Sequence, residues 1–326
     1  MVCVNGVQAL NSQVTQSPLA LAVDIGGTKI QAAAINAQGR IVAQHRMTTP
    51  AREGATAVLN AMREALHTTV LALDNGTAWL GLGISAAGVI DRAAARVTDA
   101  TDALPGWRGV DFRAAFADFN LPVQALNDVH AALMGECAWG ALAPSAAPPS
   151  AVQHAAMLTI GTGLGGALLA NGKLYTGADG LAGHFGRTQM HWQGQWMPIE
   201  ALVSGTGLAN VYTALGGTLP AYAGGREVLA QQDKALVQRT LAAWSEQLAH
   251  VIANIHWAYN PHVLLLGGGM MDARTHWFPL VEAQLQAMGL TQRMVFAELG
   301  TLAGVSGAAQ QVFAAARVPT QPRSTP

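Results

Sequence analysis

The chain has 326 residues, of which 51% are hydrophobic and 11% charged, and its formal net charge at pH 7 is −1. This length exceeds one ordinary hydrophobic core and favours two domains. The near-neutral charge, without a basic block, argues against a nucleic-acid partner. No apolar stretch reaches transmembrane length and no basic flank precedes an apolar run at the N-terminus, so we expect no membrane partner and a cytoplasmic location.

The sequence contains two cysteines, Cys3 and Cys137. Two are too few for a disulfide framework or for a zinc site built from thiolates. The cysteine count therefore agrees with the expected cytoplasmic location.

The first half of the chain is predicted to form a mixed sheet with helices. Residues 1–17 are polar and lack periodicity, so we expect a flexible arm. The patterning then predicts, in chain order, strands at 19–25, 30–35 and 41–47, a helix at 53–70, a strand at 79–85, a helix at 111–119, a strand at 123–126 and a helix at 129–139. Three strands followed by a helix fit a ribonuclease-H-like order.

The second half begins after a segment rich in Pro, Ala and Ser at 141–150. The order of strand, glycine turn and strand restarts there, which is a weak internal repeat. The predicted elements are strands at 156–161 and 166–170, a long helix at 235–259, a strand at 263–266 and a closing helix at 305–316. We expect the tail at 318–326, rich in Pro, Ser and Thr, to be disordered.

Three glycine-rich turns follow buried strands, namely Asp24-Ile25-Gly26-Gly27-Thr28-Lys29, Gly161-Thr162-Gly163 and Gly267-Gly268-Gly269. Glycine lets the backbone approach a phosphate closely and point N–H groups at it. We interpret the first two turns as a phosphate cradle and the third as bare backbone for adenine or ribose. Asp24 would orient Mg²⁺, directly or through water. Each turn alone is also compatible with an ordinary hairpin or strand end, but their joint order indicates one nucleotide held between two lobes.

Asn127 and Asp128 follow a short predicted strand and precede a helix. We interpret Asp128 as the base that accepts a proton from an acceptor hydroxyl, and Asn127 as a hydrogen-bond donor to a neighbouring sugar hydroxyl. The helix N-terminus is expected to lower the pKa of Asp128 and keep it ionised. The alternative is that the pair only caps the helix, which is the commoner use of these residue types.

Taken together, these motifs resemble the ROK family (repressors, open reading frames, kinases). The matches span residues 19 to 315 and comprise Asp24-Ile-Gly-Gly-Thr-Lys29, Leu104-Pro-Gly-Trp107, Asn127-Asp128, Gly161-Thr-Gly-Leu-Gly-Gly166, Gly172-Lys-Leu-Tyr-Thr-Gly177, Gly183-His-Phe-Gly186 and Ser204-Gly205. The resemblance implies an α/β fold of two ribonuclease-H-like (actin/hexokinase-type) domains with a cleft between them. We expect the first domain at 18–126, completed by the helix at 305–317, and the second at 127–304.

The resemblance also implies phosphorylation of a hexose at its 6-hydroxyl, using ATP and Mg²⁺. Asp128 matches the family's base and Asn127 its sugar-binding neighbour. The other positions expected at the sugar are Gly88, Thr101, His184, Arg187 and Glu200. Within the family, the segment 181–188 and Asn127-Asp128 look most like bacterial N-acetylmannosamine kinases, which implies sialic acid catabolism. Relatives are commonly homodimers, so a homodimer is expected.

One loop departs from the family pattern. Most relatives carry a zinc loop of the form Cys-x-Cys-Gly-x-x-Gly-Cys, but residues 189–199 here read Gln-Met-His-Trp-Gln-Gly-Gln-Trp-Met-Pro-Ile. His191 alone cannot supply the four ligands of a tetrahedral zinc site, so we predict no zinc. Trp192 and Trp196 would replace the metal by apolar packing and order the loop that presents Glu200. The alternative is that the two tryptophans merely cover the surface.

Three rival interpretations remain. The substrate could be glucose, fructose or N-acetylglucosamine, which Glu200 and His184 do not distinguish. A sugar-sensing repressor would carry an N-terminal helix-turn-helix, whereas about eighteen uncharged residues precede the first predicted strand. The third interpretation is a non-catalytic sugar-binding protein. The presence of four residues argues against it, namely Asp24, Asn127, Asp128 and Glu200.

Overall fold

The computed structural model describes residues 17–101, 103–144 and 152–318. The chain divides into two compact units, Met1–Ala151 with Thr301–Pro326, and Val152–Gly300. The boundary expected from the sequence lies at residue 126, whereas in this division the helix that follows residue 126 belongs to the first unit, where it packs against the closing helix. The expected arm at 1–17 and tail at 318–326 lie, except for Ser17 and Val318, outside the described residues.

The first unit is built on a five-stranded sheet in the order β3-β2-β1-β4-β7. Its strands are β1 (Leu19–Ile25), β2 (Lys29–Ile35), β3 (Ile41–Thr48), β4 (Trp79–Ala86) and β7 (Val123–Asn127). β1, β2 and β3 pair antiparallel, whereas β4 and β7 are added parallel to β1. The carboxyl ends of β1, β4 and β7 therefore share one edge of the sheet.

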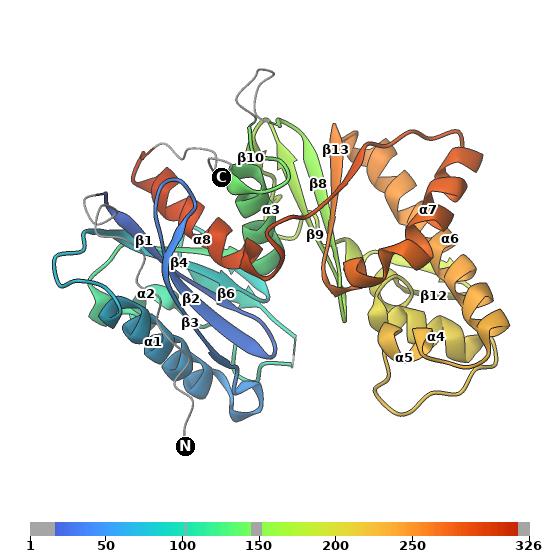
Figure 1. Ribbon diagram of the computed structural model, residues 1–326, viewed down its shortest axis with the longest axis horizontal. Helices are drawn as coiled ribbons and strands as arrows, with labels where there is room; N and C mark the ends of the chain where they lie inside the picture. The colour runs from blue at the N-terminus through green and yellow to red at the C-terminus, as the bar shows by residue number, and fades with distance from the viewer. Residues whose placement is uncertain (1–16, 102, 145–151, 319–326) are drawn as a thin grey trace. The chain divides into compact units, whose positions relative to one another are not determined.

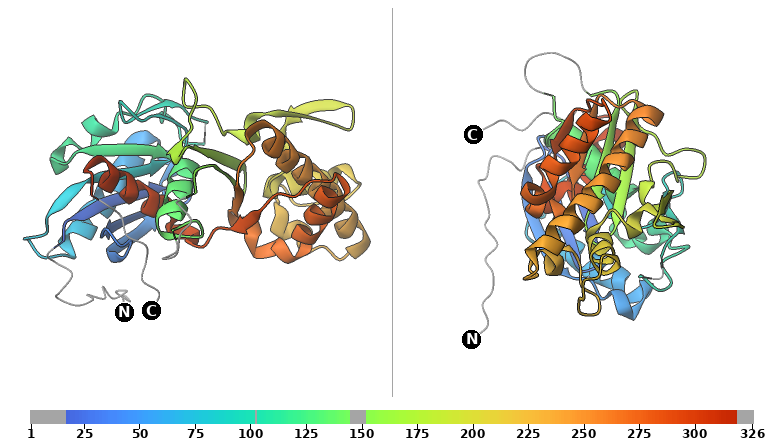
Figure 2. Two further views of the ribbon diagram at one scale, coloured as in Figure 1. Left: turned by 90° about the horizontal axis from the view of Figure 1, so that it is seen from above. Right: turned by 90° about the vertical axis from the view of Figure 1, so that its right-hand side faces the viewer.

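Helices cover both faces of this sheet (Figure 1). Because side chains alternate along β1, Leu21 and Val23 face the core that includes helix α1 (Ala55–Leu71). Ala20 and Ala22 face the opposite core, which α8 (Ala303–Ala315) and the end of α3 (Asp128–Trp139) complete. α3 and α8 lie side by side (Figures 1 and 2). Small side chains on β1 let α8 approach the sheet closely.

A small hairpin and a short helix stand beside this sheet. They are β5 (Val89–Asp91), β6 (Arg96–Asp99) and α2 (Phe112–Ala115). The sequence predicted a longer helix at 111–119, but α2 ends early and a 3-10 turn, Ala117–Phe119, follows it. The hairpin was not predicted, because its strands are too short to show an alternating pattern.

The second unit repeats the plan with the sheet order β10-β9-β8-β13-β14. Its strands are β8 (Ala155–Ile160), β9 (Leu164–Ala170), β10 (Lys173–Leu174), β13 (Val263–Gly267) and β14 (Met294–Phe296). β8 and β9 pair antiparallel, and β13 and β14 continue parallel to β8. The expected repetition of one α/β plan in two domains is confirmed.

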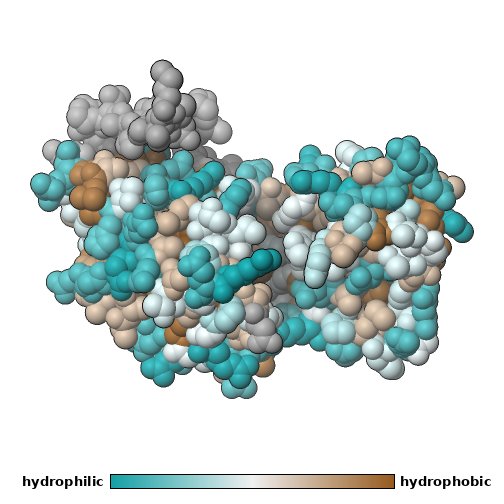
Figure 3. Space-filling model, turned by 90° about the horizontal axis from the view of Figure 1, so that it is seen from below, coloured by the Kyte–Doolittle hydropathy of each residue, from teal (hydrophilic) through white to brown (hydrophobic). Residues whose placement is uncertain are grey.

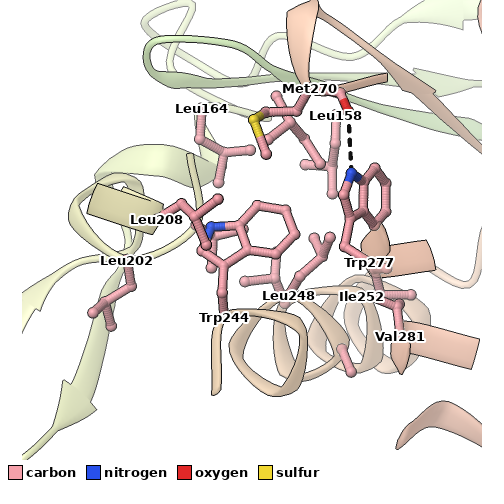
Figure 4. Packing of buried hydrophobic residues seen from close by; sticks show 14 of the residues in the cluster. Leu158, Leu164, Leu202, Leu208, Trp244, Leu248, Ile252, Met270, Trp277 and Val281 are labelled. Carbon is pink, nitrogen blue, oxygen red and sulfur yellow. Dashed lines mark hydrogen bonds between the residues drawn. The ribbon is translucent and has the colours of Figure 1, made fainter. Parts of the chain in front are cut away.

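The helices of the second unit enclose a large apolar core. They are α4 (Gly205–Ala214), α5 (Gly225–Leu229), α6 (Lys234–Tyr259) and α7 (Arg274–Ala287). Trp244 and Trp277 meet edge-to-face with their ring centroids 5.6 Å apart (Figure 4). The Trp277 indole N–H donates to the Met270 carbonyl over 3.0 Å, the dashed line in Figure 4. This bond ties α7 to the turn after β13.

Apolar residues lie scattered among polar ones on the surface shown in Figure 3. Among the helices in the described part of the chain, none is both long and apolar enough to span a lipid bilayer.

Candidate functional site

Two carboxyl groups and a hydroxyl lie at the carboxyl ends of the parallel strands of the first unit. Asp24 on β1 stands in register with Ser85 on β4, and Ala86 stands in register with Asn127 at the end of β7. Asp128 follows at the first position of α3. Parallel strands bring residues far apart in sequence to one sheet edge, where open α/β sheets commonly bind ligands.

Asp24 is half-buried among groups that do not neutralise it. Its carboxylate accepts a hydrogen bond from the Ser85 hydroxyl and lies against Gly304 in the first turn of α8. Burial, opposed by the Ser85 hydrogen bond and assisted by the charge of Asp128, raises the pKa of Asp24 to about 7. A Cβ at Gly304 would overlap the carboxylate, so the glycine lets the helix approach Asp24 closely.

Asn127 organises the turn from β7 into α3. Its Oδ1 accepts the backbone N–H groups of Val129 and His130 at 3.0 and 3.3 Å, which makes it the helix N-cap. Its Nδ2 group donates to the Gly88 carbonyl over 2.9 Å and to Asp128 Oδ1 over 2.7 Å. Both N–H groups of the amide therefore have partners within the protein.

Asp128 has a raised pKa because burial penalises its charged form. The Val129 N–H and the Asn127 amide stabilise the carboxylate and oppose that rise. The expectation that the helix N-terminus would lower this pKa is wrong, because desolvation outweighs the hydrogen bonds. A carboxylate held by two donors and destabilised by burial is suited to accept a proton.

The loop after β4 is fixed by a tryptophan. Trp107 is buried and its indole N–H donates to the Ala87 carbonyl over 3.1 Å. Gly88 adopts φ +100°, and a Cβ there would approach the Asp99 carbonyl to 2.6 Å, so the position favours glycine. Thr101, expected at the sugar, is exposed beyond the end of β6.

The turn between β1 and β2 presents Gly27, Thr28 and Lys29 to solvent. Its base is closed by the Gly26 N–H, which donates to the Lys29 carbonyl over 2.9 Å. The Thr49 hydroxyl donates to the Gly26 carbonyl over 2.8 Å. The turn is thus anchored at its base, while its tip at Gly27 and Thr28 is exposed.

The second unit holds a cavity of about 540 Å³ that is lined in part by glycines. Four chain segments supply it, through Gly161-Thr162, Gly205-Thr206, Gly224-Gly225 and Gly269-Met270. The Gly205 N–H donates to the Gly161 carbonyl over 2.7 Å, so α4 begins against the β8–β9 turn. Charged and imidazole side chains of Arg226, Glu227, Asp272 and His276 line its wall.

The third glycine turn contributes Gly269 to the lining of this cavity. Gly268 adopts φ +92°, and a Cβ there would meet the Ile160 carbonyl at 2.5 Å. Gly269 opens the 3-10 turn Gly269–Ala273 and lines the cavity, whereas Gly267 packs inward between Met157 and Ala297. Of the predicted glycines, Gly161 and Gly269 line the cavity, and Gly163 lies beside Glu200.

Glu200 contacts the turn between β8 and β9. Its Oε2 accepts the Leu164 backbone N–H over 2.8 Å, and a Cβ at Gly163 would overlap its carboxylate. His184 precedes the 3-10 turn Phe185–Arg187, in which Arg187 is exposed. A Cβ at Gly186 in that turn would lie 3.3 Å from Cβ of Glu200, so the two segments adjoin.

The wall of the cavity was missed by the sequence analysis. Gly224-Gly225, Asp272 and His276 come from segments for which no element was predicted. The glycine pair was a visible signal, since adjacent glycines also mark the other turns. The side chains of Asp272 and His276 gave no signal, because only the fold brings them to one cavity.

A duplicated α/β fold, with a carboxylate pair in one unit and a cavity lined by glycines in the other, defines the class of two-domain actin/hexokinase-like proteins. The ROK family model matches residues 20–314, and the chain belongs to this family. It is 32% identical to the N-acetylmannosamine kinase of Citrobacter koseri over 77% of this chain and 83% of that protein.

Two solved structures resemble the fold. The ROK hexokinase from Thermus thermophilus superposes with a TM-score of 0.74 at 23% identity, covering 92% of this chain and 99% of that one. A ROK family glucokinase from Streptomyces griseus, solved with glucose and AMPPNP, gives 0.69 at 25% identity, covering 90% and 98%. The predicted fold class and family resemblance are confirmed.

Proposed function

We propose that this protein is an ATP-dependent kinase that phosphorylates the 6-hydroxyl of a hexose, with N-acetylmannosamine as the substrate. The observation that carries the proposal is the Asn127-Asp128 pair, a half-buried carboxyl with a raised pKa held by donors at the end of a parallel strand. Membership of the ROK family and the relatives named as sugar kinases support the reaction class.

In this proposal Asp128 is the general base. Its carboxylate would accept the proton of the 6-hydroxyl while the hydroxyl oxygen attacks the γ-phosphorus of ATP, and ADP leaves. Asn127 acts by holding Asp128, since its amide already donates to Asp128 Oδ1 and to Gly88. A direct contact of Asn127 with the sugar would require it to exchange one of these two bonds.

The nucleotide would bind through the three glycine turns. The adenine and ribose would occupy the second unit's cavity, where the lining glycines would let them lie against the backbone. Gly26, Gly27, Thr28, Lys29, Thr162 and Gly163 would line the path of the phosphates. Asp24 and the Thr28 hydroxyl are the oxygen donors that Mg²⁺ favours, and the ion when bound would neutralise the phosphate charge.

The sugar would be bound by residues from several loops. Gly88, next to Asn127, and Thr101 would contact it from the first unit. His184, Arg187 and Glu200 would contact it from the second. N-acetylmannosamine is favoured over glucose because the 32% identical relative is named as a kinase for that sugar. We further propose that the protein acts in the cytoplasm as a homodimer, which light scattering after gel filtration tests.

The test is ADP release from ATP and Mg²⁺ with N-acetylmannosamine, N-acetylglucosamine, glucose, mannose and fructose in parallel. Turnover confined to N-acetylmannosamine is the expected result. Turnover on glucose instead would support the second candidate, a glucokinase, which the likeness to the Streptomyces griseus enzyme favours. Sugar binding without turnover on any of the five would contradict the kinase assignment and indicate a sugar-binding protein.

A further inference from the structure

Residues 189–198 form a two-stranded hairpin of β11 (Gln189–Trp192) and β12 (Gln195–Pro198), visible in the left view of Figure 2. Met190 stands opposite Met197, and His191 stands opposite Trp196. Because facing residues in an antiparallel pair share a face and neighbours alternate, the two pairs lie on opposite faces of the hairpin.

The two tryptophans of the hairpin occupy different environments. Trp192 packs, with Met190 and Met197, against the apolar core of the second unit. Trp196 is 71% exposed, and its ring meets the His191 ring edge-to-face at 5.5 Å. The expectation that both tryptophans order the loop is therefore wrong for Trp196, which lies on the solvent face.

The chain between the hairpin and Glu200 is held by a backbone hydrogen bond and by a buried side chain. The Ile199 N–H donates to the Thr188 carbonyl over 2.8 Å and closes the hairpin, and the Ile199 side chain is buried. Beyond Glu200, the Ser204 hydroxyl donates to the Glu200 carbonyl over 2.8 Å. The Trp244 indole N–H in turn holds the Ser204 carbonyl over 3.1 Å. Glu200 is thus held from both sides.

The hairpin does not fit a zinc ion. Its one residue of a zinc-binding type is His191, which points to solvent beside Trp196. Within residues 17–101, 103–144 and 152–318, no group of three or more His, Cys, Asp or Glu side chains gathers that could hold a metal. A structural zinc site needs four such ligands.

We propose that Trp192 is a positioning residue for sugar binding and that the inward face of the hairpin holds Glu200 without a metal. Glu200 would then be set against the β8–β9 turn, where its carboxylate accepts the Leu164 N–H. The role at the sugar rests on the proposed function, whereas the metal-free packing of the hairpin does not.

The test compares Trp192→Ala, Trp192→Phe and the matched surface change Trp196→Ala. Trp192→Ala should raise the KM for the sugar by about tenfold or more, because a small displacement of a binding group is costly, and leave the KM for ATP unchanged. Trp192→Phe should recover most of the loss, and Trp196→Ala should match the wild type. Equal effects of Trp192→Ala on both KM values, or a sugar KM equal to that of the wild type, would overturn the positioning role.

A second measurement does not depend on kinase activity. The metal content of the purified protein and its thermal midpoint with and without 1,10-phenanthroline are measured alongside the midpoints of the three variants. We expect substoichiometric zinc, no effect of the chelator, and a lowered midpoint for Trp192→Ala but not for Trp196→Ala. Stoichiometric zinc or a midpoint lowered by the chelator would overturn the metal-free hairpin, even if no sugar were phosphorylated.

Discussion

The half-buried carboxyl of Asp24 leads to a prediction about folding stability as a function of pH. Its pKa is raised from 3.8 to about 7 in the folded protein, chiefly by burial. Between these values the folded state binds the proton more tightly than the unfolded chain does, so stability falls as the pH rises. Asp24→Asn keeps the shape of the side chain and removes the charge. We therefore expect the variant without ligands to be more stable than the wild type above pH 7.

The size of the effect follows from the two pKa values. A shift from 3.8 to about 7 corresponds to about 4 kcal/mol at about 1.36 kcal/mol per pH unit. This is an upper limit, since solvent reaching the half-buried side chain would reduce it. The gain should be fully present at pH 8, decline through pH 7 to 4, and vanish at acid pH, where Asp24 is protonated in both states.

The assay is chemical unfolding of the wild type, Asp24→Asn and Asp74→Asn at several pH values, without nucleotide or sugar. Asp74 is an exposed carboxylate near the end of α1 and controls for the loss of one surface charge. Asp24→Asn should also lose most of its activity, because the carboxylate is the proposed Mg²⁺ contact. Equal or lower stability of Asp24→Asn at pH 8, or a gain that does not change with pH, would refute the reasoning.

Two further predictions concern the cavity and a cysteine. Gly205→Ala would place a Cβ 2.9 Å from the Gly161 carbonyl. The variant should therefore raise the KM for ATP by about tenfold and leave the KM for the sugar unchanged. A raised KM for the sugar with an unchanged KM for ATP, measured by steady-state kinetics, would contradict the assignment of the cavity to the nucleotide. Burial and the charge of Glu136 raise the pKa of Cys137 to about 12. When native protein is treated with iodoacetamide at pH 8, mass spectrometry should therefore find no label on the peptide that contains Cys137. Prompt labelling of that peptide would contradict the packing of α3.

Sequence patterns identified those elements that have long runs of one periodicity. β1 and α6 were predicted nearly to the residue, because a buried strand before a glycine turn and a long amphipathic helix before Asn260-Pro261 are strong local signals. α7 was missed because Pro279 lies inside it and its apolar positions are few. α4 was missed because glycines occupy its first turn, where they pack against backbone.

The sequence predicted the candidate site where a polar residue of a suitable type stands at the end of a predicted strand, as at Asp24 and Asn127-Asp128. The direction of the Asp128 pKa shift could not be predicted from the sequence, because desolvation depends on what surrounds the side chain in the fold. Likewise, the different environments of Trp192 and Trp196 depend on which face of the hairpin meets the core. Burial of this kind is set by tertiary packing, and the local sequence carries no signal for it.

The role of Asp128 as the base is tested most directly by Asp128→Asn in the ADP-release assay with N-acetylmannosamine, with sugar binding followed by calorimetry. Asparagine keeps the shape and the N–H contacts of the helix start but cannot accept the proton. We expect kcat to fall by about 10³-fold or more while the Kd for the sugar stays within a few-fold of the wild type. A variant with wild-type turnover would contradict the assignment of Asp128 as the base, and with it the proposed mechanism.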